Sequence, residues 1–201
     1  MRAFTVAAWA LHLGADHLVL VDDLESAITL ADPNTLLFKD GIPDDRFDLH
    51  NSPHQLQNLD VTGRRIIQRT TAGTRAALAA READNILCAS FVCATATAHQ
   101  LMASPDPEVT FVISGGLHAE EDLACAEFIA ATAQGRGLSS EPYLRRADQS
   151  AAAADLRAGV AKGYTGVTHH DVPMCLDPDR FDFAMAAHPA GEHLHLRPTN
   201  Q

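Results

Sequence analysis

The sequence has little of what marks a secreted or membrane-bound protein. Its four cysteines show no Cys-x-x-Cys spacing, so neither a disulfide framework nor a structural zinc site is expected. No apolar run approaches the roughly 20 residues that cross a bilayer. The start also lacks the basic segment, apolar stretch and small-residue cleavage site of a secretory signal. We therefore expect a cytoplasmic protein with reduced thiols and without a membrane partner.

Positive charge is also scarce. The 201 residues carry 15 Lys and Arg against 26 Asp and Glu, which gives a net charge of −11. No run of basic residues forms a stripe that tracks a polyanionic backbone, so nucleic acid is not an expected partner. An anionic small molecule remains compatible with this charge, because a pocket can be locally cationic or lined by a metal.

Apolar segments of strand type alternate with segments of helical spacing along most of the chain. A helix over residues 2–13 comes first. The strands, each followed by a helix, are expected at 17–21 before 24–31, at 64–68 before Thr74, at 85–91 before Ala94, and at 109–114 before Glu121. This order predicts an α/β protein with three layers, in which helices cover both faces of a parallel or mixed central sheet.

The domain expected from this pattern covers residues 1–187. Within it, residues 34–48 are irregular apart from a short strand at 36–38, an Ala-rich helix covers 151–160, and a last strand covers 180–185. Residues 188–201 are expected to form a loosely ordered tail, with solvated histidines at His193 and His195.

The loop Thr70–Arg75 is the first candidate for binding chemistry. It combines hydroxyl groups, a small glycine and the free amides of a helix start, a combination that suits phosphate. The alternative is that Thr74 is only a helix cap, while Thr70 and Thr71 end a strand. The loop is not a GxxxxGK[ST] sequence, which disfavours nucleoside triphosphate chemistry of that type.

A second candidate is the acidic segment from Gly115 to Asp122, where a strand ends in two glycines and three carboxylates begin a helix. Carboxylates with water suit Mg²⁺. The alternative is an acidic first turn that only complements the helix dipole. Asp40 and Asp48, in the irregular loop, are candidates for a facing carboxylate. His118 is a candidate metal ligand or general acid.

A third candidate is Phe47-Asp-Leu-His-Asn-Ser-Pro53, which brings amide, hydroxyl and imidazole groups to a helix start. Its default interpretation is an ordinary cap by Asn51 or Ser52 before a proline.

These segments, in this order, resemble the 2-phosphosulfolactate phosphatase family nearly end to end. The similar stretches are Arg2-Ala-Phe-Thr5, Phe47-Asp-Leu-His-Asn-Ser-Pro53, Thr70-Thr-Ala-Gly-Thr-Arg-Ala76, Ser90-Phe-Val-Cys-Ala94 and Glu121-Asp-Leu-Ala-Cys-Ala126. Members of this family hydrolyse a phosphate ester of a sulfonated hydroxy acid with magnesium. The resemblance therefore implies a Mg²⁺-dependent phosphoric monoester hydrolase that acts on a small phosphorylated acid.

The resemblance also implies roles for particular residues. The substrate and phosphate would be bound by Arg2, Asn51, Ser52, Thr70, Thr71, Gly73, Thr74 and Arg75. Glu121 and Asp122 would lie on the metal side, where Asp40 is a further candidate ligand. Arg2, Asp122 and His118 are the expected catalytic groups, because arginine and Mg²⁺ neutralise charge that develops on the phosphate.

Departures from the family pattern concern the start and a few motif positions. Met1 stands where the motif has Leu, so the Asp-Val before it and the strand that carries them are not in this sequence, which leaves a sheet edge uncovered. His50, Ala72 and Cys93 replace Gly, Asn and Asn, which suggests a different substrate within the same chemistry. The second hypothesis is an inactive or repurposed member that binds an anionic metabolite or a protein partner. A homodimer is a reasonable expectation for either.

Overall fold

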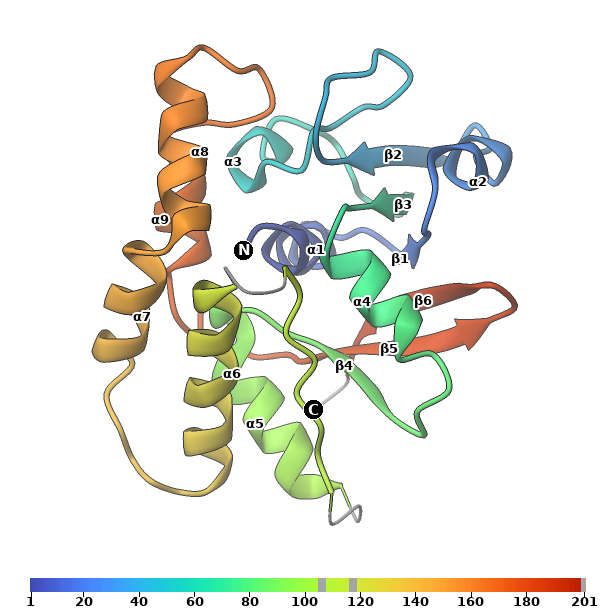
Figure 1. Ribbon diagram of the computed structural model, residues 1–201. Helices are drawn as coiled ribbons and strands as arrows, with labels where there is room; N and C mark the ends of the chain where they lie inside the picture. The colour runs from blue at the N-terminus through green and yellow to red at the C-terminus, as the bar shows by residue number, and fades with distance from the viewer. Residues whose placement is uncertain (105–107, 116–118, 200–201) are drawn as a thin grey trace.

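The computed structural model describes residues 1–104, 108–115 and 119–199. Six strands in this part form one open mixed sheet in the order β2-β3-β1-β6-β5-β4 (Figure 1). The strands are β1 His17–Leu20, β2 Thr35–Lys39, β3 Arg65–Arg69, β4 Ile86–Cys88, β5 Met185–Ala190 and β6 His193–Pro198. Strands β2, β3 and β1 are parallel, whereas β6, β5 and β4 are each antiparallel to their neighbours.

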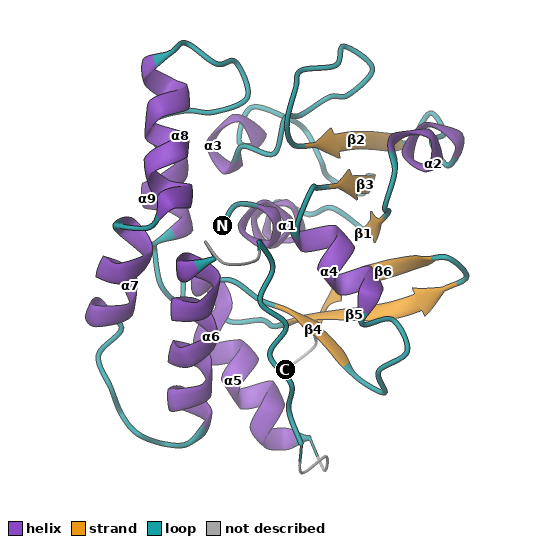
Figure 2. Ribbon diagram, viewed as in Figure 1, coloured by secondary structure: helices purple, strands orange, loops and turns teal. Residues whose placement is uncertain are grey.

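Helices cover the two faces of the sheet and gather beyond its β4 edge (Figure 2). They are α1 Ala3–His12, α2 Leu24–Thr29, α3 Pro53–Leu56, α4 Gly73–Ala79, α5 Ala94–Ala103, α6 Glu120–Ala133, α7 Glu141–Asp148, α8 Ala151–Ala161 and α9 Asp171–Cys175, with a 3₁₀ turn η1 at Phe91–Cys93. The three-layer α/β fold predicted from the alternating pattern is therefore confirmed. Asp23 caps α2, since its carboxylate accepts from Ser26 N at 2.8 Å.

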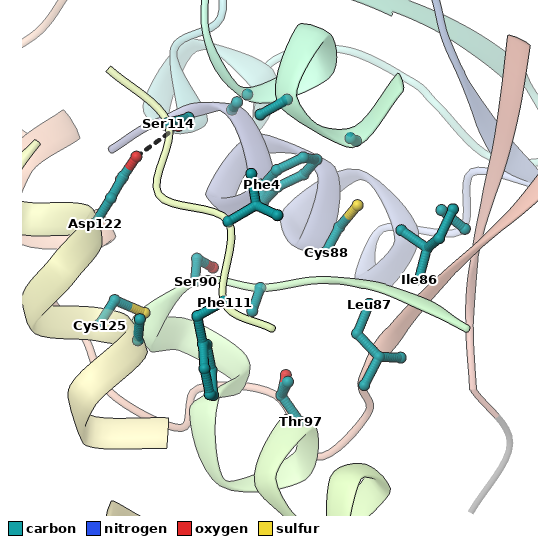
Figure 3. Close-up of a pocket in the computed structure, with 18 of the residues that line it drawn as sticks. Phe4, Ile86, Leu87, Cys88, Ser90, Thr97, Phe111, Ser114, Asp122 and Cys125 are labelled. Atoms are coloured by element: carbon teal, nitrogen blue, oxygen red, sulfur yellow. Dashed lines mark hydrogen bonds between the residues drawn. The ribbon is translucent and has the colours of Figure 1, made fainter. Parts of the chain in front are cut away.

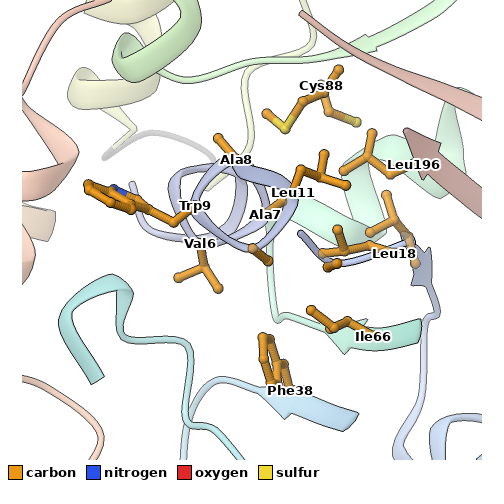
Figure 4. Packing of buried hydrophobic residues seen from close by; sticks show 14 of the residues in the cluster. Val6, Ala7, Ala8, Trp9, Leu11, Leu18, Phe38, Ile66, Cys88 and Leu196 are labelled. Atoms are coloured by element: carbon orange, nitrogen blue, oxygen red, sulfur yellow. The ribbon is translucent and has the colours of Figure 1, made fainter. Parts of the chain in front are cut away.

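The largest apolar core surrounds α1. Figure 4 shows Val6, Ala7, Ala8, Trp9 and Leu11 pointing in different directions from this helix. They meet side chains of four elements, namely Leu18 of β1, Phe38 of β2, Ile66 of β3 and Leu196 of β6. The small side chains of α1 let the sheet and the neighbouring helices come close to its backbone, which leaves the helix enclosed.

Two smaller clusters complete the core. On the opposite face of the sheet, α2 covers Val19, Leu37 and Ile67. Beyond β4, helices α5, α6 and α7 pack together around Phe128 and Ile129. None of the helices in the described part of the chain is long and apolar enough to cross a membrane.

The strand predicted at residues 109–114 is wrong. Residues 108–115 have an irregular backbone, although the next helix begins close to the predicted residue. The side chains of this segment suit a sheet surface, but a strand also needs a neighbouring strand to pair with, and β propensity does not report on that. Val109 and Val112 remain 45 % and 57 % exposed in this segment, as expected for an apolar run without a pairing partner.

The end of the chain also differs from the prediction. The last strand does not cover 180–185, because pairing begins at Met185 and continues to Ala190. The tail from residue 188 is not loosely ordered as far as it is described, because β6 lies between β1 and β5. Leu194 and Leu196 anchor this strand in the core, while His193 and His195 point to the other face and are only partly exposed.

This placement of β6 predicts that the end of the chain contributes strongly to stability. Leu194→Ala removes a fully buried side chain, so the free energy of unfolding should fall by about 2–5 kcal/mol in a denaturant titration. Leu138→Ala is the control because Leu138 is exposed, and it should change stability by about 0.5 kcal/mol or less. Equal, small effects would contradict the assignment of β6 to the sheet.

Candidate functional site

One cavity of about 1390 Å³ collects most of the predicted site residues. It is lined by the start of the chain, by the loop after β3, by the turn after β4, by residues 108–115 and by the first turns of α6. Figure 3 shows Phe4, Cys88 and Phe111 around it, with Ser114 and Asp122 at one side. The predicted residues that line it are Arg2, Asp40, Asn51, Thr70, Thr71, Gly73, Glu121 and Asp122.

The loop Thr70–Arg75, called the Thr loop below, is fixed by its own hydroxyl groups. Thr74 N donates to Thr70 Oγ1 at 2.9 Å, and Thr70 N donates to Thr74 Oγ1 at 2.8 Å. Thr74 is therefore not the cap of α4, which begins one residue earlier at Gly73. Its side chain is buried in this reciprocal contact and does not line the cavity. The contact makes the loop rigid and leaves Thr71 as the threonine whose groups face outward.

Gly73 is required by a close approach between α4 and α1. A Cβ atom at this position would lie 2.8 Å from Ala3 Cβ and 3.4 Å from Phe4 Cε2. The first distance is too short for two carbon atoms, so any larger residue would push the Thr loop away from the start of α1. The glycine thus keeps these two walls of the cavity together.

Asp40 holds the outward-facing groups of the Thr loop. Its carboxylate accepts from Thr71 N at 2.9 and 3.0 Å and from Thr71 Oγ1 at 2.8 Å, and Arg69 Nη1 lies 3.6 Å away. An anion at this amide would therefore have to share it with Asp40 or displace it. Asp48, the other acid considered in this loop, accepts from Leu37 N at 2.8 Å and has a structural role.

Glu121 and Asp122 converge at the start of α6. The Met1 nitrogen lies 3.4 Å from Glu121 Oε1 and 3.4 Å from Asp122 Oδ1. Ser114 Oγ donates to Asp122 Oδ2 at 2.6 Å. The second oxygen of Glu121, Oε2, is buried without a hydrogen-bond partner. Both carboxylates thus pair with the Met1 ammonium, and one oxygen of Glu121 stays without a partner in this wall of the cavity.

This donor set fits Mg²⁺. An unpartnered buried carboxylate oxygen is costly, and a cation would satisfy it. The described residues contain no group of three His, Cys, Asp or Glu side chains able to hold a metal, so water or ligand oxygens would complete the coordination, as is usual for Mg²⁺. His118, predicted as a metal ligand or general acid, lies outside the described residues.

Burial raises the pKa of the Cys125 thiol well above its ordinary value, which agrees with a core residue.

Asn51 lines the cavity, and Gln68 behind it holds its side chain in place. Asn51 is nearly buried and has a φ of +58°, a left-handed conformation that a residue other than glycine adopts at a cost. Gln68 Nε2 donates to Asn51 Oδ1 at 3.1 Å and to Ala3 O at 2.9 Å. This bridge fixes the amide of Asn51 against the start of α1. Ser52 follows as the cap of α3, where its Oγ accepts from Gln55 N at 3.2 Å.

Arg75 is the predicted site residue that lies apart. Its Nε is 2.8 Å from Asp22 Oδ1, and both side chains are more than half exposed. It lines a smaller cavity of about 580 Å³ on the other side of the Thr loop, together with Thr71 and Ser114. The structure thus brings Arg2 to the large cavity but does not bring Arg75 there, and the role of Arg75 stays a prediction.

Sequence reasoning missed three polar side chains near this site. Gln68 was expected only as part of a strand, and Asp171 was not among the candidate residues. Ser90 lines the cavity and its hydroxyl is buried without a partner. It lies near the carboxyl end of the strand predicted at 85–91 and within one of the stretches similar to the family, and these were the available signals for a site residue.

The fold and this cavity define an open three-layer α/β protein whose polar site lies beside the ends of strands β3 and β4, where such sheets bind small molecules. The family model for 2-phosphosulpholactate phosphatase matches residues 1–186. The chain belongs to this family.

Individual relatives agree with this assignment. A protein of Thermus thermophilus, named probable 2-phosphosulfolactate phosphatase, is 38% identical over 118 residues, which are 57% of this chain and 50% of that protein. Proteins with the same name from Deinococcus radiodurans and Synechococcus sp. RCC307 are 36% and 35% identical. Their matches cover 57% and 69% of this chain, and 50% and 60% of those proteins. The chain therefore spans about half the length of the curated relatives it matches.

The close approach at Gly73 predicts an unusual mutational effect. Gly→Ala within a helix is normally stabilising by up to about 1 kcal/mol. Gly73→Ala should instead lower the free energy of unfolding by about 1–3 kcal/mol, because its Cβ meets Ala3. The control is Gly159→Ala in α8, where the nearest atoms are side-chain atoms of Tyr164 and Val167 at 3.2 Å. A stabilised Gly73→Ala protein in denaturant titrations would contradict the described contact.

Proposed function

We propose that the chain is a Mg²⁺-dependent phosphatase that hydrolyses the phosphate monoester of a small acidic metabolite. The observation that carries this proposal is the unpartnered buried Oε2 of Glu121, beside Asp122, in the same cavity as the Thr loop and Arg2. A cation site and an anion site thus share one cavity. The names of the relatives support 2-phosphosulfolactate, or a related phosphorylated hydroxy acid, as the substrate.

Each wall of the cavity has a part in this chemistry. Arg2 and Thr71 bind and orient phosphate oxygens through N–H and O–H donors. Glu121 and Asp122 would hold Mg²⁺, which when bound neutralises phosphate charge and lowers the pKa of coordinated water. Asp40 stays a separate candidate ligand, because no three described acids gather around one ion position. His118 is the expected donor of a proton to the leaving alkoxide.

The alternative is a family member that binds an anionic metabolite without turnover. The contact between Asp40 and Thr71 bears on both functions equally, because a phosphate has to displace this carboxylate from the Thr71 amide and hydroxyl before either binding or hydrolysis. The two functions share a binding site and differ in whether phosphate is released. The four free cysteines of the described chain fit the reducing cytoplasm, and the homodimer stays a prediction.

Glu121→Gln tests the phosphatase directly. The variant keeps the shape of the side chain but removes its charge, so phosphate release from 2-phosphosulfolactate with Mg²⁺ should fall by about 10²-fold or more, since a lost charge ligand weakens both metal binding and electrostatic stabilisation. Chelation of Mg²⁺ should abolish wild-type activity. Glu127→Gln is the matched control, because this acid lies on the same helix in an exposed ion pair with Arg146.

Three results would count against the proposal. Wild-type activity that persists after chelation would exclude a requirement for the metal. Equal effects of the two substitutions would show that the site is not at Glu121. Binding of the ester without any phosphate release would favour the alternative function.

A further inference from the structure

Asp171 is a fully buried carboxylate that joins three parts of the chain behind the cavity. Its Oδ1 accepts from Ser52 Oγ at 2.6 Å and from Thr168 Oγ1 at 3.0 Å. Its Oδ2 accepts from Arg2 Nη1 at 3.1 Å and from Thr168 N at 3.3 Å. The start of α1, the start of α3 and the turn before α9 therefore meet at this one side chain.

The carboxylate and Arg2 depend on one another electrostatically. Asp171 has no exposed surface, and the Arg2 side chain is 14 % exposed. A buried charge is tolerated only when it is paired and hydrogen-bonded, so each group compensates the other. Their contact is therefore a fixed feature of the folded chain rather than a surface ion pair.

The bonds of Arg2 leave one edge of its guanidinium group available. Within the described part of the chain, both of its hydrogen bonds use Nη1, which donates to Gly166 O at 2.6 Å as well as to Asp171. Nε and Nη2 form the other edge of the planar fork, and Arg2 lines the cavity. This is the edge with which arginine binds two oxygens of a phosphate or carboxylate at once.

We propose that Asp171 is a positioning residue that orients Arg2, so that Nε and Nη2 bind an oxyanion of the ligand in the cavity. This inference rests on the proposed function only in that the ligand is a phosphorylated acid. Ser52 and Thr168 fix the carboxylate, the carboxylate fixes Nη1, and the free edge of Arg2 is thereby aimed before the ligand arrives. Preorganisation of this kind strengthens binding because no side-chain ordering accompanies it.

If Arg2 acts only through its charge, neutralising Asp171 has the opposite effect on anion affinity from the one expected if the orientation of Arg2 matters. If Arg2 acted only through its charge, Asp171→Asn would remove a nearby negative charge and strengthen anion binding. If orientation is required, the same variant releases Nη1 and weakens binding. A purely structural role for Asp171 would lower stability and leave the affinity of the folded protein unchanged.

The test measures the affinity of the full chain for inorganic phosphate by calorimetry with Mg²⁺ present. We expect Asp171→Asn to raise the Kd about 10-fold or more in folded protein. The matched control is Asp148→Asn, which neutralises an exposed acid paired with Arg157 and should leave the Kd unchanged. An unchanged or lower Kd in Asp171→Asn would overturn the proposal.

Thr168→Val provides a second, milder variant if Asp171→Asn does not fold. It removes the Oγ1 donor to Asp171 but keeps the ion pair, so a Kd about 3-fold above wild type is expected, with thermal unfolding measured in parallel. Loss of stability at an unchanged Kd would overturn the positioning role.

The wild-type chain separates this inference from the proposed function. If it binds phosphate but releases none from esters, the proposed function is refuted and this inference stands. If it does not bind phosphate, this inference is refuted.

Discussion

The enclosure of α1 is the constraint on which the site depends. Val6, Ala7, Ala8 and Ala10 have no exposed surface, so the helix is held by the sheet on one side and by α3, α4 and η1 around it. A helix enclosed in this way cannot shift without opening cavities in the core. Its first residues are therefore fixed in the large cavity.

Three acids in or behind the cavity, Asp171, Asp40 and Glu121, have different partners, and this difference suggests different roles. Asp171 is satisfied by four donors and serves to hold Arg2. Asp40 is satisfied by Thr71 and lies close to Arg69. Glu121 keeps a buried oxygen without a partner. These partners are consistent with the proposed cation at Glu121 and the proposed oxyanion at Arg2.

The parts of the fold that were predicted correctly are those set by local pattern. Apolar runs followed by segments of helical spacing located β1, β3 and β4, because periodicity acts within a few residues. Residues 109–114 show the limit of such patterns, since a strand also requires a neighbour. Residues 193–196 alternate His with Leu, a strand pattern whose buried half was overlooked in favour of the histidines.

The site was predictable only in part for the same reason. Motifs located Arg2, Thr71, Glu121 and Asp122, which line one cavity. Asp171 was missed because its partners Ser52 and Arg2 lie 119 and 169 residues away in the sequence, a separation that no local pattern reports. Arg75 matched a motif, yet its pairing with Asp22 depends on how α4 is oriented.

The central claim is that a metal at Glu121 and an oxyanion at Arg2 occupy the same cavity together. It is tested most directly by phosphorus-31 relaxation of bound inorganic phosphate with Mn²⁺ in place of Mg²⁺, because a paramagnetic ion relaxes only nuclei close to it. The account predicts strongly enhanced relaxation in the wild-type protein and its loss in Glu121→Gln. Phosphate that binds beside bound Mn²⁺ with unchanged relaxation would contradict a shared site.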